Sequence, residues 1–570
     1  MTSPRPPRPH PRRASRRLAA TLAGATAGVL VAGLGATPAQ AGSDGGAPLG
    51  TVARTASGAR FEPGPCPRTA DPIPALERAR CGTLTVPEKR SRHDGHQGHD
   101  GNQGHDGHQA PVDHHWPHGH DRDDQHGRKD HPSRTITLAV AIIPAATSRP
   151  APDPIVWLAG GPGDDAVSEI PMALAGGLNR DRDVIFMSQR GTYSADPELT
   201  CRNIDEFAAE SLDLVFGAPS TGRLHVEETR KCRDRLVSRG VDLSAYNGTE
   251  SSADYDALRK ALGIRQWNVF GISYGTDLAL QYMRLHPEGI RSVGIDGVLP
   301  PSLAGGAVTW KAAREGFDGI FRACEQQPAC NTRYPNLKAT FERLVVELEA
   351  RPVTTTVTVP GHPEPVKVVL DGGLLVNWLT FASHLAAGVP RSIDELAHGN
   401  PRRIAEQYAG GKLSPQAIGR VSHGLVFGVF CSEWTPFESE ADVIRAGRRL
   451  FPSFPRSVLA NAPLLSWMHA DCRAWDVPPA DPSIRQRTYS DIPTLVLSGG
   501  FDAQTAPSSG PYAARTLSRS TAVTVPYVAH VVFADSKCAQ TMTVSFFDRP
   551  NAPDTSCLAG LRPPTFEIAP

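Results

Sequence analysis

The pentapeptide Gly271-Ile272-Ser273-Tyr274-Gly275 lies between a short apolar run and a helix-like segment. Residues 267–270 are predicted to be a buried strand and residues 277–285 a helix, so the pentapeptide must form a sharp strand-to-helix turn. Such a turn strains the backbone of its central serine, and only glycine fits at the crowded flanking positions. We therefore predict that Ser273 is a nucleophile held above a sheet. An ordinary glycine-rich turn is the alternative.

Strands and helices alternate along much of the chain. Apolar strands are predicted at residues 155–158, 183–187, 267–270, 292–295, 494–497 and 522–525. With a helix predicted at residues 251–262, this alternation indicates an α/β fold with a mostly parallel sheet flanked by helices. Residues 301–489 break the rhythm with helix-like runs such as 337–348. We expect them to form a large, mainly helical cap inserted before the strand at 494–497.

A nucleophilic serine needs a base, and the base needs an acid that orients it. Where a serine stands on this type of turn, the chain order is serine, acid, histidine. The strand at 494–497 leads to a loop with Asp502, and the strand at 522–525 leads to a loop with His530. We expect Asp502 and His530 to complete a triad with Ser273. The alternatives are His469 or His423 for the base and Asp491 or Asp535 for the acid.

Attack on a carbonyl creates a negative oxygen that needs two N–H donors. One donor normally belongs to the residue after the nucleophile, which is Tyr274 here. The other comes from the loop after an early strand, and Gly160-Gly161-Pro162-Gly163 occupies that place. We expect Gly161 to supply the second N–H. An ordinary Gly/Pro turn is the alternative.

The N-terminus has the pattern of an export signal. Residues 1–17 carry six arginines and no acid, residues 18–34 are apolar, and Ala39-Gln40-Ala41 has the small-x-small form of a cleavage site. We expect residues 1–41 to be a signal peptide. The mature protein is then predicted to be secreted and extracellular, without stable membrane insertion.

The ten cysteines agree with export, because disulfides persist in oxidising compartments. None stands in Cys-x-x-Cys spacing, which disfavours a zinc ribbon or a thioredoxin-like redox site. The even count favours five disulfides. Taking neighbours in order gives the pairs Cys66–Cys81, Cys201–Cys232, Cys324–Cys330, Cys431–Cys472 and Cys538–Cys557.

Residues 91–133 contain eleven of the 20 histidines and have no apolar period. Such a segment cannot form a core, so we expect a disordered insert on the hairpin turn between strands at 83–86 and 135–140. Imidazoles beside carboxylates could bind Zn²⁺, Ni²⁺ or Cu²⁺ loosely. The segment lacks the fixed spacing of a catalytic metal site, and we expect no metal or other cofactor in catalysis.

The charge and size of the chain limit its partners and organisation. The 570 residues include 59 basic and 59 acidic residues, and nucleic-acid-binding domains usually have a basic surface. No nucleic-acid partner is therefore expected. Residues 42–300 are predicted to form the first part of the sheet domain, and residues 490–570 its C-terminal part with the acid and the base.

Three motifs together resemble those of a known family. They are Gly160-Gly161-Pro162-Gly163 after a strand, Gln189-Arg190-Gly191, and Gly271-Ile272-Ser273-Tyr274-Gly275-Thr276. This set is similar to the prolyl iminopeptidase and tripeptidyl aminopeptidase family of α/β-hydrolases. The secreted bacterial tripeptidyl aminopeptidases are the most similar members, with a large cap, several cysteines and a Cys-x-acid motif like Cys431-Ser432-Glu433. The resemblance spans about residues 65–561 without the histidine-rich insert, and it implies an α/β-hydrolase fold.

The chain departs from that family at three positions. Ala159 stands where histidine usually precedes the first motif, Ser188 where aspartate usually precedes the second, and Ala529 where glycine often precedes the catalytic histidine. None of these changes removes a candidate of the triad. Each of them can alter the rigidity of a loop or the rate.

The resemblance implies a secreted serine exopeptidase that releases short peptides, by analogy tripeptides, from free N-termini of peptides or proteins. A cap carboxylate would then bind the substrate's ammonium group. Glu433 is the first candidate and Asp471 the second, with a solvated surface acid as the alternative for each. Two other functions stay open: a secreted carboxylesterase on the same triad, and a non-catalytic extracellular protein that binds ligands or scavenges metal.

Overall fold

The computed structural model of the chain describes residues 59–90, 134–414, 417–461 and 463–568. The predicted signal peptide, residues 1–41, and the predicted histidine-rich insert, residues 91–133, lie outside this part of the chain. Among the helices that are described, none combines the length and the apolar character needed to cross a membrane.

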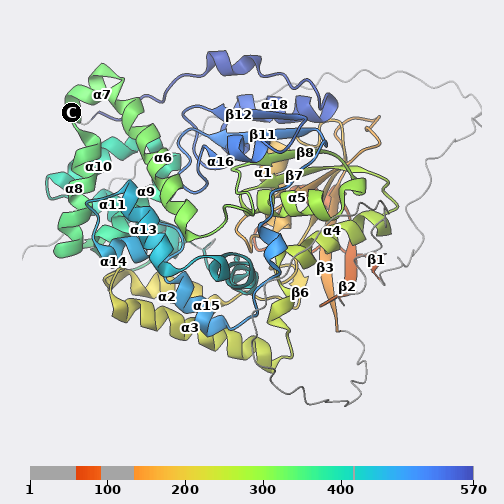
Figure 1. The fold of residues 1–570 in the computed structure, drawn as a ribbon, viewed down its shortest axis with the longest axis horizontal. Helices are drawn as coiled ribbons and strands as arrows, with labels where there is room; N and C mark the ends of the chain where they lie inside the picture. The colour runs from red at the N-terminus through yellow and green to blue at the C-terminus, as the bar shows by residue number, and fades with distance from the viewer. Residues whose placement is uncertain (1–58, 91–133, 415–416, 462, 569–570) are drawn as a thin grey trace, which may run out of the picture. The chain divides into compact units, whose positions relative to one another are not determined.

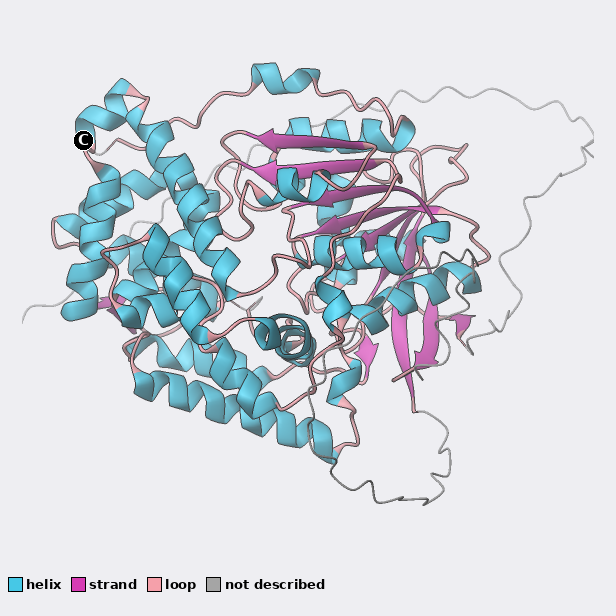
Figure 2. Ribbon diagram, viewed as in Figure 1, coloured by secondary structure: helices cyan, strands magenta, loops and turns pink. Residues whose placement is uncertain are grey.

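A ten-stranded sheet organises the described residues (Figure 2). Its strands are β1 (Arg60–Pro63), β2 (Arg80–Pro87), β3 (Thr135–Ile143), β4 (Ile155–Leu158), β5 (Val184–Met187), β6 (Ala195–Asp196), β7 (Trp267–Ile272), β8 (Ile290–Asp296), β11 (Thr494–Gly499) and β12 (Ser520–Val525). The spatial order is β1-β2-β3-β5-β4-β7-β8-β11-β12, and β6 pairs with β3. Pairs along β1-β2-β3-β5 are antiparallel, and pairs along β5-β4-β7-β8-β11-β12 are parallel. The predicted mostly parallel sheet is confirmed.

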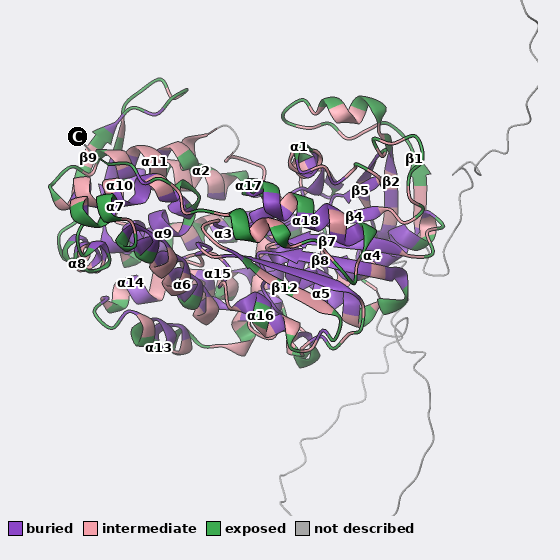
Figure 3. Ribbon diagram, turned by 90° about the horizontal axis from the view of Figure 1, so that it is seen from above, coloured by how far each residue is buried: buried purple, intermediate pink, exposed green. Residues whose placement is uncertain are grey.

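The central strands are buried on both faces (Figure 3). Every residue of β4, β5, β7 and β11 is buried, which is why these strands consist mostly of apolar residues. Neighbouring residues of β7 face opposite sides, with Val269 in one apolar cluster and Phe270 in another. The covering helices are α4 (Gly248–Ala261) and α5 (Tyr274–Leu285) on the Val269 side, and α1 (Ile170–Ala175) and α18 (Lys537–Asp548) on the Phe270 side. Helices thus cover both faces, as predicted.

Between β8 and β11 the chain leaves the sheet and forms a helical region, which we call the cap (Figure 1). Its helices are α6 (Gly306–Glu325), α7 (Pro328–Arg333), α8 (Leu337–Ala350), α9 (Gly372–Ala382), α10 (Val389–Ala397), α11 (Arg402–Leu413), α12 (His423–Val429), α13 (Glu440–Leu450), α14 (Arg456–Asn461) and α15 (Met468–Trp475). A hairpin of β9 (Val353–Val357) and β10 (Val366–Leu370) joins them. The cap has its own apolar core around Trp310, Phe317 and Phe341.

Two helices that precede β7 pack against the cap. α2 (Arg202–Glu210) contacts α11, and α3 (Pro219–Ser238) contacts α15 (Figure 1). A hydrogen bond of 2.8 Å from Thr229 on α3 to Asp471 on α15 joins the second pair. These contacts join segments on either side of the boundary that the sequence predicts at residue 300.

All ten cysteines are paired. The bonds are Cys66–Cys81, Cys201–Cys232, Cys324–Cys330, Cys431–Cys472 and Cys538–Cys557. These are the pairs that result from taking neighbours in order. The bond between Cys431 and Cys472 ties the turn after α12 to α15, next to the cavity-lining residue Phe430.

Candidate active site

Ser273 lies in the turn between β7 and α5. Its dihedral angles, φ 53° and ψ −123°, fall in a region that residues with a side chain rarely adopt. A Cβ atom on Gly275 would lie 2.2 Å from the carbonyl oxygen of Leu158, so only glycine fits there. The local sequence thus forces a tight turn, which places Ser273 on the wall of a cavity of about 560 Å³.

Asp502 and His530 are in direct contact. Asp502 Oδ2 lies 2.9 Å from His530 Nδ1, and the Asp502 side chain is fully buried after β11. Its Oδ1 accepts hydrogen bonds of 2.8 Å from the N–H groups of Gln504 and Thr505, and the Thr505 hydroxyl donates to Oδ2 at 2.6 Å. These donors fix the carboxylate, which in turn can orient the imidazole ring.

Ser273 and His530 line the same cavity. The Ser273 hydroxyl makes no hydrogen bond to any described residue. Contacts between a nucleophile and its base are often long without substrate and shorten when substrate binds. The structure therefore brings the three predicted triad residues to one cavity, with the contact between acid and base already formed.

Of the four alternative residues, His423 lines the cavity of Ser273, and the other three lie outside its lining. His423 on α12 pairs with Asp205 at 2.7 Å, and His469 lies on α15 away from the cavity lining. Asp535 contacts His384 at 2.9 Å, and Asp491 is exposed before β11. His423 is thus the one alternative base that lines this cavity, and its acid partner is Asp205, neither Asp491 nor Asp535.

Carboxylates surround His530. Burial alone would lower the pKa of His530, but the charges of Asp502, Asp296 and Asp164 outweigh it and raise the pKa above its ordinary value. Burial alone would likewise raise the pKa of Asp502, but His530 and the Thr505 hydrogen bonds hold that pKa below its usual range. The pair therefore combines an imidazole that readily accepts a proton with an acid that favours its ionised form.

We expect the raised pKa of His530 to appear in the pH profile. A base must be neutral to accept a proton, so activity is lost as the pH falls through the pKa of His530. The midpoint of the acid limb of kcat/KM should therefore lie above about 6.5, the ordinary value for histidine. Hydrolysis of a p-nitrophenyl ester, which has no amine to titrate, gives this profile. A midpoint well below that value would contradict the arrangement.

Asp296, which the sequence analysis did not single out, ties the nucleophile turn to the histidine loop. Its backbone carbonyl accepts from Ser273 N–H at 2.8 Å, and its carboxylate accepts from Val532 and Phe533 N–H at 3.0 and 2.7 Å. Burial raises the pKa of Asp296 to about 7. The sequence signal that could have identified Asp296 is its position at the end of β8, because functional sites of α/β sheets lie at the carboxyl ends of the parallel strands.

Gly161 and Tyr274 flank the nucleophile. Both line the cavity, and Tyr274 opens α5, where N–H groups lack partners within the helix. A Cβ atom on Gly160 would lie 3.1 Å from Ser273 Cβ, so the loop after β4 passes very close to the serine. The predicted oxyanion-hole residues thus both lie at the cavity of Ser273.

Glu433, expected to bind a substrate ammonium group, does not line the cavity. Its Oε1 accepts from Gly248 N–H at 2.6 Å and its Oε2 from the Gln281 amide at 3.1 Å, and the side chain is buried. Burial raises its pKa to about 7. Glu433 therefore joins the cap to the start of α4 and to α5, and the expectation that it anchors substrate is corrected. Its sequence neighbours Phe430 and Trp434 do line the cavity.

Asp471, the second candidate anchor, is also engaged elsewhere. Its Oδ1 accepts from the Thr229 hydroxyl at 2.8 Å and lies 3.2 Å from His225 Nδ1. The side chain is buried between α15 and α3, outside the cavity lining. Its role is to hold these two helices together, which corrects the expected contact with substrate.

Two other carboxylates line the cavity, Asp164 and Glu169. Glu169 accepts a hydrogen bond from the indole N–H of Trp157, and burial raises its pKa well above the ordinary value. Asp164 receives no hydrogen bond from any described residue, and burial raises its pKa to about 6 against the opposing effect of His530. Asp164 is thus ionised above about pH 6 and free to bind a cation. Its sequence signal was its position directly after Gly163.

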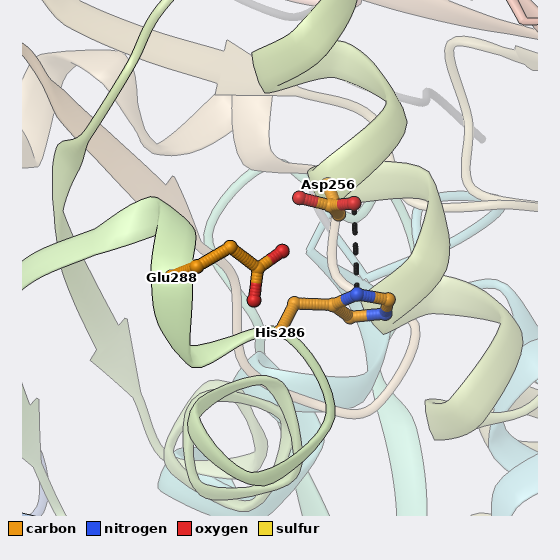
Figure 4. Close-up of side chains that lie close together, drawn as sticks. All are labelled: Asp256, His286 and Glu288. Atoms are coloured by element: carbon orange, nitrogen blue, oxygen red, sulfur yellow. Dashed lines mark ion pairs between the residues drawn. The ribbon is translucent and has the colours of Figure 1, made fainter. Parts of the chain in front are cut away.

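Another cluster of side chains in the described chain consists of Asp256, His286 and Glu288 (Figure 4). Their potential ligand atoms lie within 4.8 Å of one another. Asp256 is already paired with Arg259 at 2.8 Å and with Lys260 at 2.6 Å. Two cations on one carboxylate leave little negative charge for a metal ion, and we assign no metal to this cluster.

Comparison with known proteins supports the fold. A family model described as "alpha/beta hydrolase fold" matches residues 153–389, and one described as "TAP-like protein" matches residues 458–557. The chain has the α/β-hydrolase fold. The predicted fold class of this hydrolase is thereby confirmed, and so is its predicted status as an enzyme.

Several relatives of the hydrolase carry the names of peptidases. Serine protease Hip1 of Mycobacterium tuberculosis is 23% identical over 406 residues, which cover 66% of this chain and 75% of that protein. Tripeptidyl aminopeptidase of Streptomyces lividans is 28% identical over 336 residues, covering 57% and 60%. A probable proline iminopeptidase of Streptomyces coelicolor is 28% identical over 159 residues, covering 26% and 49%. The chain is a TAP-like serine hydrolase.

Proposed function

We propose that this hydrolase is a secreted serine exopeptidase that releases tripeptides from the free N-termini of peptides or proteins. Secretion is supported by the export pattern of residues 1–41 and by five disulfides, which persist in oxidising compartments. The length of the released peptide is supported by the similarity to a tripeptidyl aminopeptidase.

In the proposed reaction, His530 accepts the proton of the Ser273 hydroxyl while Oγ attacks the carbonyl carbon of the peptide bond. The N–H groups of Gly161 and Tyr274 stabilise the resulting oxyanion. His530 then donates the proton to the leaving amine, and an acyl-enzyme remains. Water attacks this ester with His530 again as base, which releases the peptide acid and restores Ser273. Asp502 orients the imidazole throughout.

Asp164 is the observation that carries the exopeptidase proposal. Its carboxylate lines the cavity of Ser273 and His530 and receives no hydrogen bond from the described residues. A cavity wall with an ionised, unpaired acid favours a cationic group of the substrate, and a free N-terminus supplies an ammonium group. A neutral ester offers no such partner, so the same wall gives an esterase no benefit.

We expect N-terminal acetylation of a peptide to lower kcat/KM by at least about tenfold, because it leaves the Asp164 carboxylate unpaired. Asp164→Asn should bring the ratio of free to acetylated peptide close to one. Mass spectrometry of the products gives the cleaved bond, and rates are normalised to a p-nitrophenyl ester because Asp164 also affects the pKa of His530.

Glu433→Gln is the matched control, since the Glu433 carboxylate faces Gly248 and Gln281 instead of the cavity. It should leave the ratio as in the wild type. Equal cleavage of free and acetylated peptides, or cleavage of esters alone, would favour the carboxylesterase. A preference for free N-termini that survives in Asp164→Asn would leave the exopeptidase in place and exclude Asp164 as its anchor.

A further inference from the structure

A second cavity of about 300 Å³ lies beside the catalytic one. The two cavities share Phe381, His423 and Leu464 as lining residues, so these side chains form their common boundary. Phe381 is 47% exposed, so its side chain is only partly packed. Because the two cavities share lining residues, a peptide bound at Ser273 lies next to the second cavity, which we call the side cavity.

The side cavity combines aromatic walls with one amine. Besides Phe381, its aromatic lining residues are Phe207 and Phe216, which precede β7, and Tyr408 and Trp467 of the cap. Lys412, on α11 one turn after Tyr408, also lines it, with Nζ 5.7 Å from the centroid of the Tyr408 ring. Burial lowers the pKa of Lys412, which reflects the cost of holding its charge away from water.

The ammonium group of Lys412 has no acceptor among the residues that the structure describes. Among the described residues, no carboxylate lies within 4.0 Å of Nζ and no oxygen accepts a hydrogen bond from it. Every other described lysine is ion-paired or exposed. The paired ones are Lys89, Lys231, Lys260, Lys311 and Lys338, and the exposed ones are Lys367 and Lys537. The amine in the side cavity is thus exceptional within the described chain.

Asp205, which also lines the side cavity, is already engaged. Its Oδ1 lies 2.7 Å from His423 Nε2, and its Oδ2 accepts from Gly419 N–H at 2.8 Å. The charge of Asp205 partly opposes the lowering of the Lys412 pKa by burial, but the two side chains make no ion pair. Removing a cation from water without a partner costs free energy. A bound anion recovers part of this free energy through its attraction to the cation.

We propose that the side cavity is a subsite for a carboxylate of the bound peptide, with Lys412 as its counter-ion. The carboxylate is either an acidic side chain or the C-terminus of a short peptide. The proposal rests on the proposed function in one respect, that the substrate is a peptide. It adds a preference for acidic substrates that neither the triad nor Asp164 provides.

Binding to the Ser273→Ala variant tests the subsite without any need for turnover. Short peptides with a free N-terminus are compared by isothermal titration calorimetry. The first set carries Glu or Gln at each of the first three positions, with an amidated C-terminus. The second set carries Gln only, with a free or amidated C-terminus. We expect one acidic peptide to bind at least about tenfold more tightly than its neutral partner, as charged hydrogen bonds do.

Lys412→Met, added to the Ser273→Ala background, should remove this difference, and Lys412→Arg should keep part of it. Lys367→Met is the matched control and should leave the difference intact, because Lys367 is exposed on β10. Thermal unfolding of Lys412→Met checks that the variant is folded under the conditions of the titration.

Equal binding of acidic and neutral peptides, or an acidic preference that survives in Lys412→Met, would overturn the subsite. Failure of the wild type to cleave any of these peptides would overturn the exopeptidase instead. Acid-selective binding that depends on Lys412 would then still support the subsite, so the two failures can be told apart.

Discussion

Ser273→Ala is expected to lower kcat by about a million-fold, because loss of the nucleophile disables a triad that acts as a unit. The Ser273 side chain lines the cavity and makes no hydrogen bond to the described residues. Its removal should therefore leave the fold intact. Steady-state cleavage of a peptide with a free N-terminus gives kcat, and thermal unfolding separates lost chemistry from lost stability.

Ser238→Ala is a suitable control, because Ser238 is an exposed residue at the end of α3. It should retain the wild-type rate. Wild-type kcat in Ser273→Ala would exclude Ser273 as the nucleophile, and an unfolded Ser273→Ala protein would show that the side chain has a structural role instead.

Asp502→Asn should lower kcat by about ten-thousand-fold with little change in structure. The asparagine oxygen can still accept from Gln504 and Thr505 N–H, but its amide would then face His530 Nδ1. An amide donor at this place forces the imidazole into the tautomer with its proton on the Ser273 side. His530 could then no longer accept the serine proton. The same peptide assay measures this loss.

Asp491→Asn distinguishes Asp502 from the alternative acid on the other side of β11. Asp491 is exposed, and its substitution should leave kcat unchanged. The reverse pattern, with activity lost in Asp491→Asn and kept in Asp502→Asn, would reject the proposed acid.

Local chemistry explains why much of the sheet domain could be predicted. β7 consists mostly of apolar residues because both its faces are buried, and Gly271 and Gly275 are required by close contacts at the turn. The loops with Asp502 and His530 follow directly from β11 and from β12, so their position depended on strands that were already recognisable. Neighbouring cysteines could be paired because short loops bring them together.

The contacts of the cap could not be predicted from local sequence in the same way. Glu433 follows a cap cysteine, but whether its carboxylate faces the cavity or the start of α4 depends on residues about 150 to 185 positions away. The packing of α2 and α3 against the cap has the same long-range origin. Asp164 and Asp296 were missed because a single aspartate after a loop or a strand looks like many others. Only the folded chain places these two beside His530.

Labelling with a fluorophosphonate probe, followed by peptide mapping, tests the central claim most directly, because the probe bonds covalently to an activated serine. We expect one labelled residue in the wild type, Ser273, and strongly reduced labelling in Asp502→Asn. Labelling of a different serine, or an active enzyme that the probe neither labels nor inhibits, would contradict the assignment of this site.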